Sequence, residues 1–202
     1  MTITDSPTFR HRGLMLDAGR RHFPVPLVKT ILDGMSASKL NVLHLHLSDF
    51  GGFRVQTAQY PELTAGLVDD VGNPLYWNAS DVHDIVQHAS DRGIRVMPEV
   101  DLPGHAAAFV PLAGATGVQF CTNESSTPGM LPSQLYDDPE GRTWKVLHAV
   151  LSELFPLFPD SVFHLGADET GRDVKVCDNT LLHCVLRREH PRCLLGSLFV
   201  AF

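Results

Sequence analysis

The sequence lacks an excess of basic residues, since 16 lysines and arginines stand against 23 aspartates and glutamates, for a formal net charge of -7. Nucleic acids and anionic membranes bind basic patches, so this balance argues against both as main partners. There is also no run of roughly 20 apolar residues that could span a membrane. Residues 1–7 lack a basic start followed by an apolar core, so no signal peptide is visible. We therefore expect no nucleic-acid and no membrane partner, and the compartment stays unknown.

Cysteine is scarce as well. The chain of 202 residues has four cysteines, three of them after residue 170, which is too few for a disulfide scaffold in a chain of this length. With 44% hydrophobic and 19% charged residues, the composition is that of a globular domain with one sizeable core.

Strand-like and helix-like segments alternate along most of the chain. Helical stripes of apolar residues begin near Pro26, after a predicted cap at Ser80 and after a predicted cap at Thr143. Repeated strand–helix units of this kind predict an α/β fold with a parallel sheet covered by helices. Short apolar runs predict its strands at residues 13–17, 40–47, 94–100 and 161–166.

Polar side chains follow each of these predicted strands at the point where the strand ends. In an α/β barrel, the carboxyl ends of the strands form the rim that carries the chemistry. Four separate strands that deliver polar groups to one rim favour a functional site there. The residues concerned are Asp17, Arg20, His46, Asp49, Glu99, Asp101, His105, Asp168 and Glu169.

The number of units predicts an incomplete barrel. Four strand–helix units occupy about 160 residues, whereas a complete (β/α)₈ barrel has eight units and typically about 250 residues. Residues 171–202 show no further clear unit. We therefore expect a (β/α)₈ TIM-barrel fold that is truncated after about four units, with residues 1–170 as the N-terminal half of the barrel and residues 171–202 as a divergent tail.

Four segments of the sequence resemble successive signatures of glycoside hydrolase family 20, the β-N-acetylhexosaminidases. They are residues 12–23 (RGLMLDAGRRHF), 39–49 (KLNVLHLHLSD), 98–105 (PEVDLPGH) and 164–169 (HLGADE), and they occur in the family's order. The resemblance implies hydrolysis of terminal N-acetylglucosamine or N-acetylgalactosamine from glycoconjugates or chitin oligomers. Members of the family are often lysosomal or secreted.

The resemblance also implies a retaining, substrate-assisted mechanism, in which the sugar's own 2-acetamido oxygen attacks the anomeric carbon. Glu169 would be the acid that protonates the leaving oxygen and later activates water. Asp168 would hold the acetamido group and stabilise the positive charge on its nitrogen. A protonated Glu169 beside an ionised Asp168 requires environments that separate the two pKa values.

Five further residues are implied to bind the substrate. Arg20 matches the family arginine that grips sugar hydroxyls, a use suited to its planar set of donors. Asp49 matches a carboxylate in the polar network that lines the pocket. Asp101 and His105 belong to the Pro-Gly-His segment, and His46 is expected beside them. We expect these side chains to orient the sugar and to adjust the acid.

Departures from the family pattern keep a second hypothesis open. Phe50 stands where members commonly have a second acid, and Gly19 stands where Ser or Ala is usual. The tryptophans, the tyrosine and the further acid of the family's later strands are not recognisable in these residues, and from the sequence we expect no N-terminal accessory domain of the usual kind. The alternative is a catalytically inactive truncated fragment or a sugar-binding remnant.

Another alternative concerns His44 and His46, which share one face of a predicted strand. Such a pair can bind zinc in amidohydrolase-like enzymes. That scheme explains neither the Asp-Glu pair nor the Pro-Gly-His segment, so we expect no metal and no other cofactor. Linkage preference stays open from the sequence, and so does a homodimer.

Overall fold

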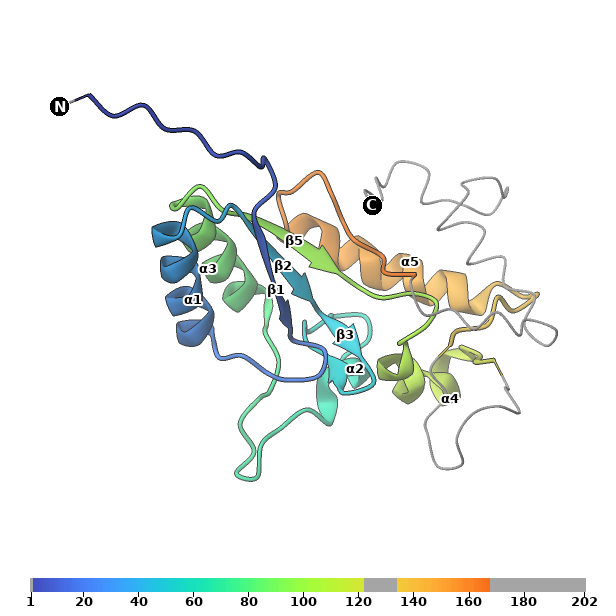
Figure 1. The fold of residues 1–202 in the computed structure, drawn as a ribbon. Coiled ribbons are helices and arrows are strands. Elements are labelled where there is room, and N and C mark those ends of the chain that lie inside the picture. Colours follow the sequence, from blue (N-terminus) through green and yellow to red (C-terminus); the bar gives the residue numbers. More distant parts are fainter. Residues whose placement is uncertain (1, 122–133, 168–202) are drawn as a thin grey trace.

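A computed structural model describes residues 2–121 and 134–167. Its centre is a parallel sheet of strands β1 (Gly13–Asp17), β2 (Val42–His46) and β5 (Arg95–Glu99), in the order β1-β2-β5 (Figure 1). Three of the predicted strands and their parallel pairing are thus confirmed. The expected truncation, and the boundary at residue 170, which lies outside the described residues, stay predictions.

The predicted strand at residues 161–166 is shorter than expected. It forms a single parallel bridge from His164 to Glu99 of β5. Backbone hydrogen bonds flank this bridge, from His164 N to Pro98 O (2.9 Å) and from Val100 N to His164 O (3.1 Å). The segment turns away at Gly166, whose φ of +64° is a left-handed conformation that ends an extended strand. It therefore takes the place of a fourth strand beside β5 without forming a ladder.

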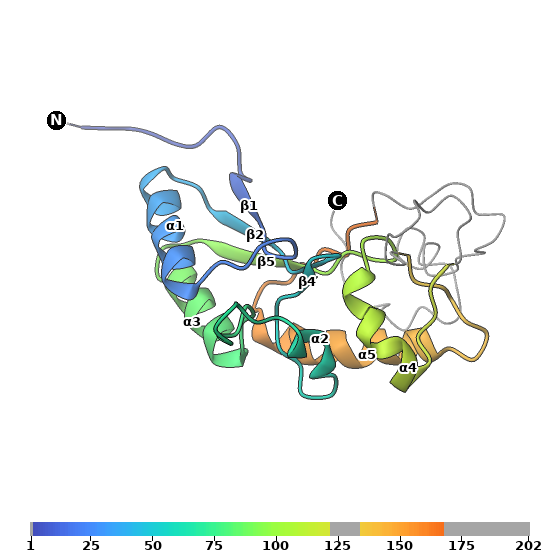
Figure 2. The same ribbon diagram turned by 90° about the horizontal axis from the view of Figure 1, so that it is seen from below.

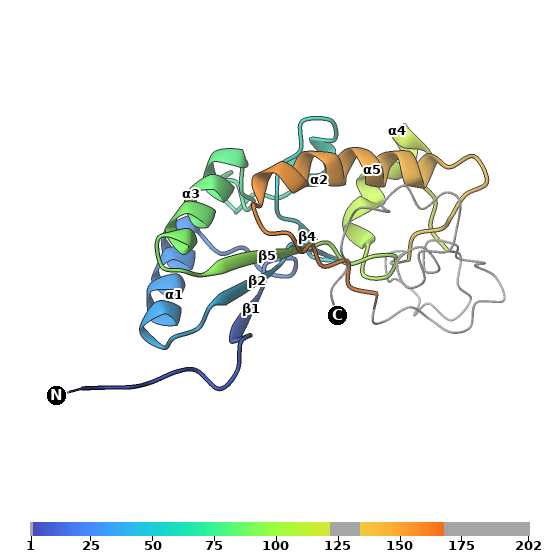
Figure 3. The same ribbon diagram turned by 90° about the horizontal axis from the view of Figure 1, so that it is seen from above.

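Three helices lie on the same side of the sheet (Figures 2 and 3). They are α1 (Val25–Ala37), α3 (Ala79–Ser90) and α5 (Arg142–Leu154). Leu16, Leu45 and Val96 of the strands are buried in the same core as the helix residues. Their neighbours in the strands point to the opposite face, where Met15 is 53% exposed. One face of the sheet is therefore covered by helices, and the other carries partly exposed side chains.

Helix α3 begins two residues earlier than predicted. Asn78, not Ser80, is its N-cap, because the Asn78 side chain accepts a hydrogen bond from Asp81 N while the Asp81 carboxylate accepts one from Asn78 N. This reciprocal capping box requires an acid or amide three residues after the cap. Asp81 meets the requirement for Asn78, whereas Ser80 would need it from His83.

Helix α5 also has a different cap. Its N-cap is Gly141, with a φ of +68°, and the predicted cap Thr143 is a buried residue of the first turn. The carboxylate of Asp138 accepts hydrogen bonds from Arg142 N (3.0 Å) and Thr143 N (2.8 Å). An acid outside the helix thus satisfies the donors that a cap residue would otherwise take. The helix continues past Leu154 as a 3₁₀ turn, η2 (Phe155–Leu157).

The loops at the carboxyl ends of the strands contain short elements that the sequence did not predict. These elements are β3 (Ser48–Asp49), β4 (Gly52–Phe53), α2 (Glu62–Ala65), η1 (Ala107–Leu112) and α4 (Ala113–Thr116).

No helix in the described ranges is long and apolar enough to cross a membrane.

Candidate active site

The strand register lines up four polar residues across the carboxyl end of the sheet. Asp17 pairs with His46, and His46 pairs with Glu99. Glu99 forms the bridge to His164. Neighbouring strands lie about 4.8 Å apart, so residues in register are within reach of one another. This set, Asp17, His46, Glu99 and His164, is called the rim row below.

Asp49 is the centre of the polar cluster in front of the rim row. It lies in β3 and is fully buried, and its Oδ1 accepts a hydrogen bond from Phe50 N (2.6 Å). Its Oδ2 lies 3.0 Å from His46 Nε2 and 2.8 Å from a guanidinium nitrogen of Arg20. Burial raises the pKa of Asp49, but the hydrogen bonds from His46, Phe50 N and His105 outweigh it and hold the pKa below its ordinary value. Asp49 is therefore a fixed anion.

Arg20 bridges two carboxylates at the end of β1. Its Nη1 lies 2.7 Å from Asp17 Oδ2, and its Nη2 makes the contact with Asp49. The guanidinium carbon also stands 5.1 Å from the ring centre of Phe50, a cation–π distance. Phe50, which replaces the second acid of the family pattern, thus packs against the arginine. The Arg20 side chain is 42% exposed, whereas Asp49 is fully buried.

His105 joins the cluster from the loop after β5. Its backbone has a φ of +50°, and its Nδ1 lies 3.3 Å from Asp49 Oδ1 and 3.5 Å from Arg20 Nη2. Residues from three separate loops of the chain therefore meet within hydrogen-bonding distance. The structure brings together four of the five predicted substrate-binding residues: Arg20, His46, Asp49 and His105.

Asp101 plays a different part. It is buried, and its Oδ1 accepts a hydrogen bond from Ala167 N (3.0 Å). A β-carbon at Gly166 would overlap this carboxylate, so only glycine fits there. Asp101 thus fixes the turn immediately before residues 168 and 169. A direct contact of Asp101 with substrate stays a prediction. Asp168 and Glu169, the predicted catalytic pair, lie outside the described residues.

Glu99 is the residue that sequence reasoning noted at a strand end but did not place in the site. Oε2 of its carboxylate lies 2.6 Å from His44 Nε2 and 3.0 Å from His46 Nδ1. Oε1 lies 3.2 Å from His164 Nδ1. Burial raises the pKa of Glu99, but the interactions with His164, His44 and His46 lower it well below its usual range. The strand register is the signal that could have found it.

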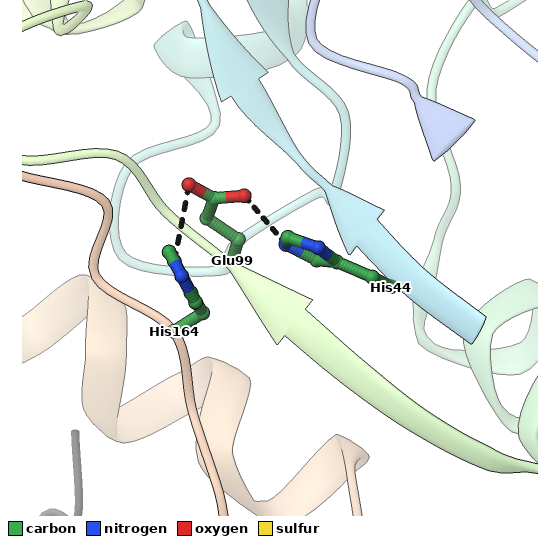
Figure 4. Close-up of side chains that lie close together, drawn as sticks. All are labelled: His44, Glu99 and His164. Atoms are coloured by element: carbon green, nitrogen blue, oxygen red, sulfur yellow. Dashed lines mark hydrogen bonds and ion pairs between the residues drawn. The ribbon is translucent and has the colours of Figure 1, made fainter. Parts of the chain in front are cut away.

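His44, Glu99 and His164 lie close enough together to be considered as metal ligands, since their ligand atoms are all within 4.8 Å of one another (Figure 4). Two ligands of one tetrahedral zinc ion, each bonded at about 2.0–2.1 Å, would be about 3.3 Å apart. The 2.6 Å between His44 Nε2 and Glu99 Oε2 is instead a charge-assisted hydrogen bond. The geometry therefore fits a hydrogen-bonded network better than a zinc site.

Comparisons with known proteins identify the family of the chain. Residues 9–185 match the glycosyl hydrolase family 20 catalytic domain. Beta-hexosaminidase 1 of Arabidopsis thaliana is 35% identical over 175 residues, which are 85% of this chain and 29% of the relative. Beta-hexosaminidase of Vibrio furnissii is 31% identical over 195 residues, 87% of this chain and 31% of the relative. The chain thus spans less than a third of the length of these curated relatives.

Solved structures give the same result. The family 20 exo-β-N-acetylglucosaminidase of Vibrio harveyi, in complex with N-acetylglucosamine, has a TM-score of 0.69 at 30% identity, covering 84% of this chain and 29% of that chain. The chitobiase of Flavobacterium johnsoniae has a TM-score of 0.68 at 35% identity, covering 88% of this chain and 26% of that chain. These neighbours imply a TIM-barrel-type catalytic domain. The chain belongs to glycoside hydrolase family 20.

Proposed function

We propose that this protein is a β-N-acetylhexosaminidase that removes terminal N-acetylglucosamine or N-acetylgalactosamine from glycoconjugates or chitin oligomers. The observation that carries the proposal is the convergence of Arg20, Asp49 and His105 at the carboxyl end of the sheet. In the sequence, Asp168 and Glu169 directly follow the turn at residues 166–167, and this turn is held by the hydrogen bond from Ala167 N to Asp101. The β-hexosaminidases among the relatives support the reaction class.

In the proposed mechanism the substrate supplies its own nucleophile. The 2-acetamido oxygen attacks the anomeric carbon and forms a new C–O bond as the bond to the leaving oxygen breaks. Glu169 gives its proton to that leaving oxygen. Asp168 accepts a hydrogen bond from the acetamido N–H and offsets the positive charge that develops on the oxazolinium ring. Water then attacks the anomeric carbon and gives its proton to Glu169, while the bond between that carbon and the acetamido oxygen breaks and restores the acetamido group, so the product keeps the β configuration.

The described cluster would orient the sugar for these steps. Ion pairs with Asp17 and Asp49 fix the plane of the Arg20 guanidinium, a planar set of donors whose geometry suits sugar hydroxyls. The Asp49–His105 contact supports an imidazole that adjusts the proton affinity of Glu169. The alternative of an idle fragment is not favoured by the comparisons, because the relatives are named β-hexosaminidases. A homodimer stays a prediction, and sedimentation of the full chain would measure its oligomeric state.

The experiment is hydrolysis of an aryl β-N-acetylglucosaminide by the full chain and by Glu169→Gln. The variant should lose at least about a hundredfold in kcat, because general acid–base catalysis contributes about 10²–10⁴-fold. Glu153→Gln is the matched control: this α5 carboxylate binds the backbone of Ala58 and Gln59 and should keep full activity. Substrate assistance further requires that the corresponding aryl glucoside, without an acetamido group, is not turned over. Equal activity of Glu169→Gln and the unchanged chain would disprove the assignment.

A further inference from the structure

The imidazole of His46 joins two buried carboxylates. Its Nδ1 lies 3.0 Å from Glu99 Oε2 and its Nε2 lies 3.0 Å from Asp49 Oδ2. An ionised carboxylate only accepts hydrogen bonds, and a neutral imidazole has only one N–H to offer. An imidazolium cation, with one N–H toward each anion, therefore fits the position of His46 between the two carboxylates best.

The surroundings agree with this charge. Burial lowers the pKa of His46, but the hydrogen bonds to Glu99 and Asp49 outweigh it and, with the charge of Asp17, raise the pKa to about 9. The side chain is only 10% exposed, so water screens these interactions weakly. The other charged or titratable groups that face this unit are Arg20, His44, His105 and His164.

Glu99 is the reason that His46 carries a full charge. Without an anion at Nδ1, a neutral His46 with one proton on Nε2 would satisfy Asp49 equally well in number of hydrogen bonds. Asp49 would then keep Arg20 as a cationic partner, but its other cationic partner, His46, would be neutral. The Asp49 carboxylate would be held less firmly in its orientation, and its contact with His105 would weaken.

We infer that Glu99 is a positioning residue of the candidate sugar site, acting through His46 to hold Asp49 in the orientation that Arg20 and His105 use. Glu99 contacts His46 on one side of the ring, and Asp49 contacts it on the other, so the influence of Glu99 passes through the imidazole. This inference rests on the proposed function and assigns to the end of β5 a part in the same reaction.

The test is Glu99→Gln in the full chain, a substitution that keeps the shape of the side chain and removes the charge. Ring ¹⁵N NMR of the unchanged chain should show that His46 keeps both ring protons up to about pH 8 and loses one only at higher pH. In the variant its pKa should fall by about one unit or more, and the ¹³C-detected pKa of Asp49 should rise. With an aryl N-acetylglucosaminide, kcat/KM should fall about tenfold or more and its pH profile should shift.

Two companion variants separate positioning from mere support of the fold. Glu99→Asp retains the anion and should restore the high pKa of His46 and part of the activity. Glu153→Gln, the same change on α5, should alter neither. Where Glu99→Gln does not fold, His46→Gln removes the imidazolium directly and should give the same loss of kcat/KM and the same rise in the pKa of Asp49.

The outcomes are distinguishable. A folded, unchanged chain without turnover contradicts the proposed function, whereas the NMR measurement still judges the inference. His46 titrating near its ordinary pKa, or a Glu99→Gln chain with unchanged pKa values at His46 and Asp49, overturns the inference. It is also overturned if those pKa values change while kcat/KM and its pH profile stay the same.

Discussion

Arg20 and Asp49 form an ion pair of 2.8 Å in which the arginine side chain is 42% exposed and the aspartate has no exposed surface. The pair joins the loop after β1 to strand β3. The buried partner sets the position, and the partner at the surface is accessible to a ligand. Arg20 is therefore the residue of this pair that we expect a sugar to meet.

Arg20→Lys should weaken the binding of N-acetylglucosamine about tenfold or more. An ammonium keeps the charge but cannot face Asp17, Asp49 and a sugar with one rigid fork. Titration calorimetry measures the affinity. Arg95→Lys is the control, because Arg95 makes a two-point ion pair with Asp160 (2.8 and 2.9 Å) at the start of β5. Equal weakening in both variants would contradict a specific role for Arg20.

The free energy of unfolding should fall as the pH rises from about 6.5 to about 9. His46 has a folded pKa above its unfolded value, so its contribution is complete below the unfolded pKa and is lost as the pH passes the folded pKa. The shift corresponds to about 3 kcal/mol. Urea unfolding at several pH values measures it. His46→Gln should remove this part of the slope, and an identical slope in both chains would refute the prediction.

Gly166→Ala should destabilise the protein by about 1–3 kcal/mol. The residue has a left-handed backbone, and an added β-carbon would overlap the Asp101 carboxylate that holds Ala167. The variant should also lose activity, because the turn leads into Asp168. Gly34→Ala in α1 offers the opposite case: a β-carbon there would have open space around it, and the helix should gain about 0.5–1 kcal/mol. Thermal unfolding compares the two variants.

Asn78→Ala should cost about 1 kcal/mol of stability, since it removes the side chain that caps α3. Ser80→Ala should change stability little, because Ser80 is an exposed residue inside the helix. Denaturant unfolding of the two variants compares the caps directly. A larger loss from Ser80→Ala would show that the observed cap is wrong.

Periodicity predicted three strands of the sheet and the helices that cover it, but not that residues 161–166 form only a single bridge. Of the predicted stripe Val28, Ile31, Leu32 and Met35 in α1, for example, three positions are buried and Ile31 is partly buried against the core. The caps were harder, because Asn78 and Ser80 are both good cap residues and only the partner at the third position separates them. Asp138 could not be predicted as the partner of α5, since it acts from outside the helix.

For the site, strand ends predicted which polar residues share the rim, and the structure places Arg20, His46, Asp49 and His105 in contact. The pairing within that group could not be predicted, because it depends on how the strands are aligned. The sequence did not show that three imidazoles surround Glu99, because these contacts depend on the relative positions of His44, His46 and His164 in the folded chain. The hydrogen bond from Ala167 N to the Asp101 carboxylate could not be predicted either, because sequence patterns carry no signal for a contact between a side chain and a distant backbone amide.

The alignment of the rim row also determines which length changes the protein tolerates. Deleting one residue from β2 ahead of His46 would turn its imidazole toward the helix-covered side and bring an apolar neighbour to the side that carries the polar cluster. Deleting two would restore the facing but draw the ring away from Glu99 by one full pleat. Point substitutions in β1, β2 and β5 should therefore be better tolerated than insertions or deletions there, whereas the connections from each helix to the next strand, at the end of the sheet away from the polar cluster, can vary in length.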